Sequence, residues 1–147
     1  MTVTADANEA IRRRLAEREV RYTRGRQSVV KALQRVNGPQ SAADLHGRIR
    51  SVPLSSLYRS LTVLDDAGVL RKHHDADGLA RFELAEWLAG HHHHVVCTVC
   101  GIVEDVQLDA DAETTLHDLA EGIARSAGYD VSDHVLEIEG VCSGCRT

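Results

Sequence analysis

Two Cys-x-x-Cys pairs constrain this chain more than any other feature of its sequence. The first pair is Cys97 and Cys100, the second is Cys142 and Cys145, and 41 residues separate the two pairs. Each pair can hold an ion with two thiolates, and two pairs complete a tetrahedral shell of four sulfurs, which suits zinc or iron. Because the pairs are distant in sequence, a strand and a helix must fold between them. We therefore predict a small domain that is clamped by structural Zn²⁺, with metal binding linked to folding.

Two disulfides or a thioredoxin-like redox pair are the alternative interpretations of these cysteines. Neither pair lies between a strand and the start of a helix, which is the position of a redox pair, and Gly101 after Cys100 fits a zinc knuckle. The chain has no run of about 18 apolar residues, and its first residues lack an apolar signal core. We expect a cytoplasmic protein without a membrane span, in a compartment where cysteines are more often metal ligands than disulfides.

Charge is divided unequally along the chain. Residues 1–78 carry 14 Lys and Arg against 9 Asp and Glu, a net charge of +5, whereas residues 79–147 carry 3 against 13, a net charge of −10. A basic half joined to an acidic half suggests that only the first half meets a polyanion. The alternative is that these basic residues only solvate helix surfaces.

The first half has the pattern of helices followed by a β-hairpin. Apolar spacing and caps predict helices over residues 6–18, after Thr23, after Ser41 with Asp44 as capping-box partner, and from Ser55 or Ser56 to Gly68. Two short strands around an Asp/Gly turn follow, over residues 69–74 and 79–84. Tandem helices and a hairpin predict a winged helix-turn-helix at 1–84, although a helical protein–protein module has similar periodicity.

The last predicted helix of this half is the candidate DNA-reading helix. Its inward positions are Leu57, Leu61 and Leu64, so the residues between them point outward. An outward arginine can donate two hydrogen bonds to a guanine edge. The outward residues are Ser55, Ser56, Tyr58, Arg59 and Thr62.

The second half has a different pattern. Strands are predicted at 95–97, 102–106 and 135–138, and a helix at 109–126 carries Leu116, Leu119 and Ile123 on one side. The order β-β-α-β indicates a small α/β domain at 91–147 after a hinge at 85–90, so the whole chain is of the α+β class. This domain has little apolar material, and dimerisation or a metal would help it to fold.

Four consecutive histidines, residues 91–94, lead into the first cysteine pair. Side chains alternate between the two faces of a strand, so His91 and His93 should point one way and His92 and His94 the other. The run therefore offers two ligands to each of two metal sites. A solvated polar run or a cloning remnant is the alternative, and the internal position beside a metal motif argues against both. Candidates for the missing ligands are Glu83, His73, His74, Glu113, His117 and His134.

Taken together, these motifs resemble the ferric uptake regulator (Fur) family of metal-dependent transcriptional repressors. The resemblance spans nearly the whole chain, and the histidine run with two cysteine pairs is its most specific part. It implies a winged-helix domain, an α/β dimerisation domain, a homodimer, a structural zinc and one or two regulatory metal sites. The matching segments are Thr23-Arg24-Gly25-Arg26, Ser55-Ser56-Leu57-Tyr58-Arg59-Ser60-Leu61, Arg81-Phe82-Glu83-Leu84, residues 91–101, His134 and the closing cysteine pair.

The resemblance also implies ligand sets. The structural zinc is assigned to Cys97, Cys100, Cys142 and Cys145, and a regulatory site to Glu83, His92 and His94. A second regulatory site is assigned to His91, His93 and His134, with its carboxylate on the helix after Cys100. Glu113 fits that position counting forward from the cysteines and is our choice, whereas His117 fits counting back from His134.

One departure from the family concerns the ligand that the DNA-binding domain often adds to the regulatory site. This chain has Pro39-Gln40 at that point, so we expect a wing histidine, His73 or His74, to substitute, and we assign His74. The sequence leaves the sensed metal open among Fe²⁺, Zn²⁺ and Mn²⁺, because His and Glu sites accept all three.

The expected function is that of a metal-responsive repressor of metal homeostasis genes, with a divalent co-repressor, iron or zinc foremost. We expect a homodimer on a palindromic double-stranded DNA operator, with Arg24 and Arg26 on phosphates and Arg59 on a base. The alternatives are a metal-buffering protein and a zinc-dependent enzyme, neither of which would bind DNA. The sequence contains no His-Glu-x-x-His motif, and we expect no enzymatic activity.

Overall fold

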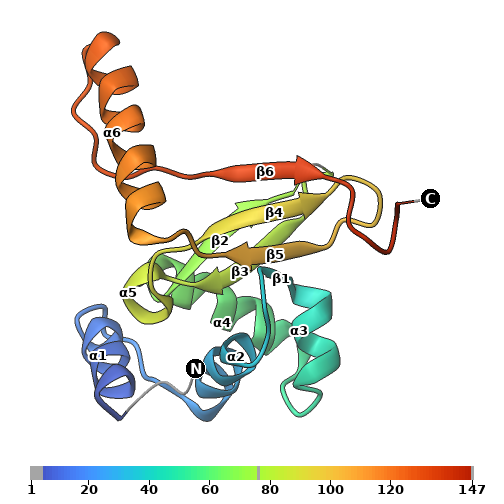
Figure 1. Cartoon of the computed structure of the whole chain (residues 1–147). Helices are drawn as coiled ribbons and strands as arrows, with labels where there is room; N and C mark the ends of the chain where they lie inside the picture. The colour runs from blue at the N-terminus through green and yellow to red at the C-terminus, as the bar shows by residue number, and fades with distance from the viewer. Residues whose placement is uncertain (1–4, 76, 147) are drawn as a thin grey trace. The chain divides into compact units, whose positions relative to one another are not determined.

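The structure, a computed structural model, describes residues 5–75 and 77–146. The chain divides into two compact units, Met1–Gly90 and His91–Thr147. Both units contain strands and helices, so the predicted α+β class is confirmed (Figure 1). Within the described residues, no helix combines the length and the apolar character needed to cross a membrane.

Helices α2, α3 and α4 form the centre of the first unit and pack against one another. Helix α1 adds Ile11 and Leu15, both fully buried, to the same core, in which Leu57, Leu61 and Leu64 of α4 lie as predicted. The inward positions recur every three or four residues, as a helix with one buried face requires. The helices of this unit are α1 (Ala5–Ala16), α2 (Arg24–Gln34), α3 (Ala42–Arg48), α4 (Leu54–Asp66) and α5 (Glu86–Ala89).

Side-chain caps fix the starts of α2 and α3. Thr23 Oγ1 accepts a hydrogen bond from the Arg26 backbone N–H at 3.4 Å. Ser41 and Asp44 form the predicted capping box, with reciprocal bonds of 3.1 and 3.0 Å that satisfy two backbone N–H groups. Helix α4 differs, because it begins at Leu54 after Pro53 and has no side-chain cap, one residue before the predicted serine start.

Helices α1 and α4 end in the same backbone motif with different residues. In α4, Val69 N–H donates to Leu64 O and Gly68 N–H to Asp65 O, each at 2.9 Å. In α1, Val20 and Glu19 make the equivalent bonds to Leu15 and Ala16. This Schellman motif needs a left-handed residue, which is Gly68 at φ 66° in α4 and Glu19 at φ 57° in α1. Glu19 is the one described residue other than glycine with positive φ.

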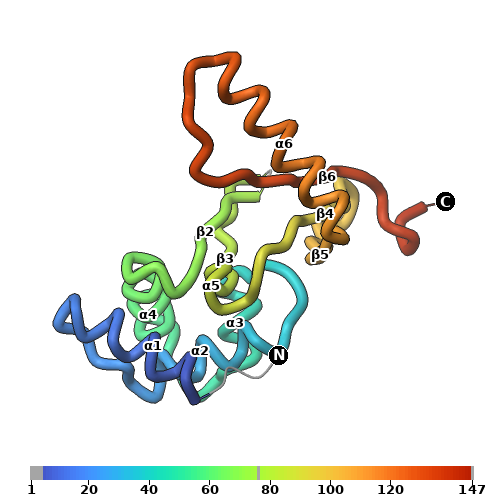
Figure 2. Tube along the Cα trace, turned by 60° about the vertical axis from the view of Figure 1, so that its left-hand side comes forward, coloured from blue at the N-terminus to red at the C-terminus, as the bar shows by residue number. Residues whose placement is uncertain are grey.

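The wing of the first unit is a three-stranded antiparallel sheet with the strand order β1-β3-β2, in which β1 is Gln40–Ser41, β2 is Leu70–His74 and β3 is Ala80–Leu84. The hairpin of β2 and β3 extends beyond the helices of its own unit (Figure 2). Asp75 after β2 accepts the Leu79 N–H and Arg81 Nε, both at 2.9 Å. The two-residue strand β1 was not predicted, because so short a segment carries no alternating pattern.

The segment predicted as a hinge, residues 85–90, contains α5. Trp87 Nε1 donates a 2.7 Å hydrogen bond to Gly68 O. The guanidinium carbon of Arg14 lies 4.4 Å from the centre of the Trp87 ring, a cation–π contact. Leu88 and Ala89 pack on the core of the first unit. The chain is therefore attached to this unit up to Ala89.

The second unit is built on a sheet with the order β5-β4-β6 and a single helix. Strand β4 pairs with β5 in antiparallel and with β6 in parallel orientation. The central strand therefore carries two of the four histidines and the first cysteine. The elements are β4 (His93–Cys97), β5 (Val103–Val106), α6 (Ala110–Ser126) and β6 (Glu137–Gly140), the last of which begins two residues later than predicted.

The apolar side chains of the second unit are mostly on its surface. Helix α6 buries none of its residues, and Leu119 and Ile123 are 59% and 61% exposed. Among the described residues of this unit, those that are buried are His93, His94 and Cys97. The apolar side of α6 therefore has the predicted spacing but no core to cover within one chain.

Candidate metal centres and nucleic-acid interface

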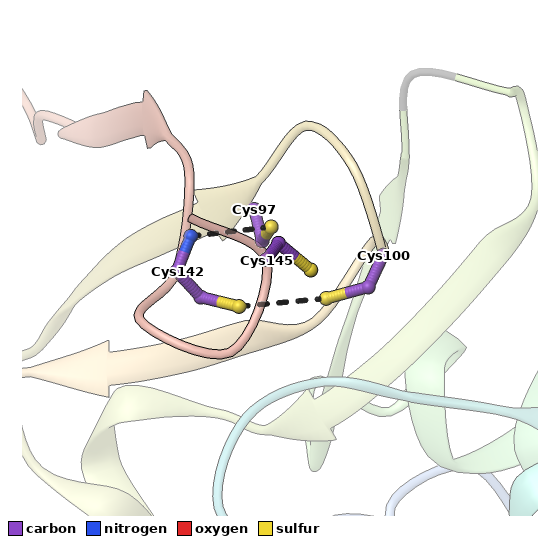
Figure 3. A group of neighbouring side chains, drawn as sticks. All are labelled: Cys97, Cys100, Cys142 and Cys145. Carbon is purple, nitrogen blue, oxygen red and sulfur yellow. Dashed lines mark hydrogen bonds between the residues drawn. The ribbon is translucent and has the colours of Figure 1, made fainter. Parts of the chain in front are cut away.

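The four cysteines meet at one end of the second sheet (Figure 3). Parallel pairing of β4 with β6 sets Cys97 opposite Gly140, which brings the cysteines that follow β6 beside those that end β4. All four sulfur atoms lie within 4.8 Å of one another. Cys100 Sγ and Cys142 Sγ are 3.8 Å apart. Sulfurs bound at about 2.3 Å around a tetrahedral Zn²⁺ stand about 3.8 Å apart, so the cluster fits this ion.

Backbone hydrogen bonds close the two Cys-x-x-Cys turns and influence the ionisation of the thiols. Gly101 N–H donates to Cys97 O at 2.9 Å, and Cys145 N–H donates to Cys142 O at 3.0 Å. Backbone N–H groups of Cys100, Cys142 and Val99 lower the pKa of the Cys97 thiol to about 6. Neighbouring sulfurs, first that of Cys142, raise the pKa of Cys145 to about 12. A cation is the group that lets such crowded thiolates coexist.

A second cluster joins His91 and His93 to α6 and to the segment before β6. Glu113 Oε1 lies 3.0 Å from both His91 Nε2 and His134 Nε2, and Glu113 Oε2 lies 2.8 Å from His93 Nε2. The contact with His93, first among these, lowers the pKa of the Glu113 carboxyl. Asp109 caps α6 by accepting the Ala112 N–H at 2.8 Å, which sets Glu113 one turn inside the helix. Three imidazoles around one carboxylate suit a divalent transition metal.

The structure distinguishes Glu113 from His117 as the helix member of this cluster. His117 is exposed, and its Nε2 lies 3.5 Å from Glu121. Its ring centre is 6.1 Å from that of His134. Glu113 is therefore the residue of α6 whose carboxylate faces the histidines.

The other two histidines of the run form a third group with Asp105 on β5. The His92 and His94 ring centres are 5.2 Å apart. Asp105 Oδ1 lies 3.6 Å from His94 Nε2 and 3.9 Å from His92 Nε2. Among the described residues this buried oxygen has no hydrogen-bond donor, which is costly for a carboxylate unless a cation satisfies it. Two imidazoles and one such oxygen fit a divalent ion.

Asp105 was missed by the sequence interpretation, although a signal for it existed. The turn after Cys97 is closed by the Cys97 N–H to Ile102 O bond at 2.9 Å, which fixes the β4–β5 register. In that register His94 lies opposite Asp105. Counting back across a knuckle turn of known length would have identified the residue.

The assigned residues of the first unit are Glu83 and His74. Glu83 on β3 is buried, and its Oε1 lies 2.5 Å from Nε2 of His73 on β2. His74 is exposed at the end of β2. In the first unit, His73 is therefore the wing histidine beside Glu83.

The predicted DNA-reading residues of α4 share the exposed side of that helix. Tyr58 is 55% exposed, and Arg59 is exposed beside it. Arg24 at the start of α2 is exposed, whereas Arg26 directs Nη1 to the Arg21 carbonyl. The guanidinium of Arg26, which was expected to contact a phosphate, is therefore bonded to the backbone of the loop before α2. All the residues of α4 that were predicted to point outward are exposed, namely Ser55, Ser56, Tyr58, Arg59 and Thr62.

Helices with a β-hairpin wing, joined to a unit rich in metal-binding side chains, are an arrangement typical of metal-responsive transcription regulators. Comparison with known proteins identifies the family to which this chain belongs. The profile of the Ferric uptake regulator family matches residues 17–139. The chain belongs to this family, whose members are transcription regulators.

Named relatives agree with this family. A "Ferric uptake regulation protein" of Synechococcus elongatus is 30% identical over 152 residues, which cover 99% of this chain and 97% of that protein. One of Neisseria meningitidis is 36% identical over 95 residues, 65% of this chain, and the match spans 61% of that relative's length. The ferric uptake regulator (Fur) of Vibrio cholerae superposes with a TM-score of 0.71 at 28% identity, covering 92% of this chain and 98% of that one.

Proposed function

We propose that this protein is a repressor of metal homeostasis genes that binds operator DNA when a divalent metal, iron or zinc foremost, is bound. The observation that carries the proposal is the sorting of four adjacent histidines into two groups. One pair faces Asp105, and the other faces Glu113 and His134. Neither group is needed to build the cysteine cluster, so the histidines have a role other than structural zinc.

The cysteine cluster supplies the structural site of this proposal. Cys97, Cys100, Cys142 and Cys145 would hold Zn²⁺, because their sulfur spacing fits a tetrahedral ion. When bound, the ion neutralises the thiolates and ties β4 to the segment after β6. A unit with so few buried apolar residues depends on such a clamp.

The regulatory metal is proposed to act through residues on both sides of Gly90. The resemblance to the family assigns Glu83, His92 and His94 to one ion. We add Asp105 to this set, because its Oδ1 lies near the Nε2 atoms of both histidines. His74 was the fourth assigned ligand, and it is exposed, whereas His73 is the wing histidine that contacts Glu83. A ligand set drawn from two units binds the metal more tightly in one arrangement of the units than in the rest. The metal then favours the arrangement that matches DNA.

The second histidine group is proposed as a further regulatory site. His91, His93, Glu113 and His134 place four donor atoms within 4.8 Å of one another. All four belong to the second unit. An ion there would fasten α6 to the sheet, and its main effect would be on the stability of that unit.

The partner of the second unit is proposed to be another copy of this chain. Leu119 and Ile123 on α6 and Ile138 on β6 are at least half exposed. An isologous contact between two such faces would bury them without a different partner. A two-fold dimer presents two reading helices, which predicts a palindromic operator. DNA binding also implies a cytoplasmic protein.

Metal-dependent DNA binding is the test of the proposal. Duplexes are first selected from a random pool by the zinc-loaded, Mn²⁺-saturated protein, and their affinity is then measured by fluorescence anisotropy at buffered free Fe²⁺, Mn²⁺ and Zn²⁺. We expect affinity to rise at least about tenfold with one of these metals, the usual size of a coupling between two sites. Equal affinity for DNA with and without every metal would overturn the proposal. The exposed Arg59 on α4 favours DNA binding over metal buffering as the function.

A further inference from the structure

We propose that His73 is a positioning residue for the regulatory metal: it donates a hydrogen bond to one carboxylate oxygen of Glu83 and so orients this carboxylate as a ligand. The proposal rests on the function proposed above, in which Glu83 is a ligand. It assigns His73 a role in a part of the site that the sequence had given to His74.

The strand register brings His73 and Glu83 together. On the antiparallel pair β2–β3, His73 is opposite Arg81, and Glu83 is opposite Arg71. His73 and Glu83 are therefore diagonal neighbours on one face of the wing. Diagonal side chains of this length can reach each other. His73 Nε2 and Glu83 Oε1 are 2.5 Å apart, with the two side chains 28% and 8% exposed.

The arginines of the same face have carboxylates of their own. Arg71 Nη1 donates to Glu86 at 2.9 Å. Arg81 contacts Asp75 at 2.9 Å and Asp44 at 3.5 Å. The imidazole of His73 lies on the same face and is directed at Glu83.

The 2.5 Å separation supports a hydrogen-bonding role for His73. Two ligands of one ion, each bound at about 2.1 Å, stand about 3 Å apart in an octahedral shell and farther apart in a tetrahedral one. The His73–Glu83 separation is shorter than that and is a close hydrogen-bond contact, somewhat below the roughly 2.7–2.9 Å usual for a charge-assisted N–H···O bond. His73 therefore acts on Glu83 and not as a ligand beside it. Ligating carboxylates are commonly oriented by such bonds, and the loss of one lowers metal affinity about 10- to 100-fold.

Three variants of the full-length, zinc-loaded protein test this role. His73→Ala removes the donor, His73→Gln keeps an N–H donor at a similar reach, and Lys72→Ala is the matched control on the same strand. All three are made with His91→Ala and His93→Ala, so that the other histidine group does not bind the probe. Co²⁺ is the probe, because its absorption bands report coordination and its affinity follows from competition with a chelator. Trp87 fluorescence confirms that the first unit is folded.

We expect His73→Ala to weaken Co²⁺ binding about 10- to 100-fold, with His73→Gln recovering most of the loss and Lys72→Ala matching the parent. The Co²⁺ bands should keep their positions, because the ligand atoms are unchanged. In a Glu83→Ala background, His73→Ala should have no further effect.

Three results would overturn the proposal. In the first, His73→Ala binds Co²⁺ as tightly as Lys72→Ala. In the second, His73→Gln fails to recover affinity and the bands shift, which makes His73 a direct ligand. In the third, a His74→Ala variant made in the same background shows the loss instead. Failure of the proposed function is separate, because it appears as metal-independent DNA binding by the parent protein, whatever the Co²⁺ affinities are.

Discussion

His94 on β4 lies directly opposite Asp105 on β5, with Nε2 and Oδ1 3.6 Å apart. The neighbouring residue, His93, faces the other way and contacts Glu113 at 2.8 Å. One peptide bond therefore separates residues of two different groups of candidate ligands. This relationship leads to the most direct test of the two histidine groups.

Removing the histidines in pairs should separate their functions. His92→Ala with His94→Ala should leave a folded, zinc-containing protein that gains no DNA affinity when metal is added. His91→Ala with His93→Ala should remove a different ion and mainly lower the thermal stability of the second unit. Each variant keeps two histidines, so composition is matched and only the face differs. Metal content, melting temperature and DNA affinity are measured for both, and identical losses in the two variants would contradict the two-group arrangement.

The cysteine cluster should be essential for the second unit. Cys97→Ser removes the buried thiolate that three backbone N–H groups stabilise. Structural zinc contributes on the order of 10 kcal/mol to folding in small domains, so the second unit should unfold or lose its self-association. Zinc content and sedimentation velocity measure the outcome. The first unit, followed by Trp87 fluorescence, should stay folded. A Cys97→Ser protein that keeps one equivalent of zinc and its oligomeric state would show that the cluster is not structural.

Replacing the exposed arginines of α4 and α2 should change DNA binding in two different ways. Arg59→Ala should weaken a specific operator by roughly 1–3 kcal/mol and relax the preference at one base pair, if Arg59 contacts a guanine. Arg24→Ala should weaken all duplexes alike and flatten the salt dependence. Operator and scrambled duplexes are compared at several salt concentrations. Retained base preference in Arg59→Ala would reassign this residue to the phosphate backbone.

Arg26 calls for a different expectation from its neighbour Arg24. Its guanidinium is bonded to the Arg21 carbonyl, so its replacement acts on the loop before α2. Arg26→Ala should lower the unfolding free energy of the first unit by about 1 kcal/mol, the net value of one hydrogen bond. Urea unfolding followed by Trp87 fluorescence provides the measurement. Unchanged stability together with a reduced salt dependence of DNA binding would restore the phosphate role.

Stability of the first unit should depend on pH through the capping box of α3. Hydrogen bonds from Ser41 lower the pKa of Asp44 below its ordinary value of 3.8. The ionised carboxylate therefore stabilises the folded state fully above pH 3.8, and this contribution is lost as pH falls through the lowered folded pKa. Asp44→Ala should cost about 1 kcal/mol near pH 7, and the gap to the parent should narrow below pH 4. Urea unfolding at several pH values checks this, and a gap independent of pH would contradict it.

Local patterns in the sequence predicted most of the fold. The caps at Thr23 and Ser41 and the inward leucines of α4 depend on neighbours within one helical turn, and all are present. The alternation of the histidines follows from the two-residue period of a strand. These features need no knowledge of distant residues.

The parts that were missed depend on pairing between strands or between chains. The contacts of Asp105, and those that favour His73 over His74 beside Glu83, come from cross-strand register, which spacing along one strand does not specify. The side of α6 that carries Leu119 has the predicted spacing, and its exposure follows from how little apolar material one copy of the unit contains. The bond of Arg26 to the Arg21 carbonyl was not foreseen, because it depends on loop geometry, and its phosphate contact stays a prediction.

The alternation along β4 limits which sequence changes this protein can accept. Whether a residue of this strand lies at an odd or an even position decides which face of the sheet its side chain is on. Substitutions at Val95 and Val96 do not change the face on which any histidine or Cys97 lies. Inserting a single residue between His94 and Cys97 would turn the histidines to the opposite faces and move each of them one position along the strand, away from its present neighbours. Point substitution is therefore open to this strand, whereas a change of length by one residue disrupts both histidine groups at once.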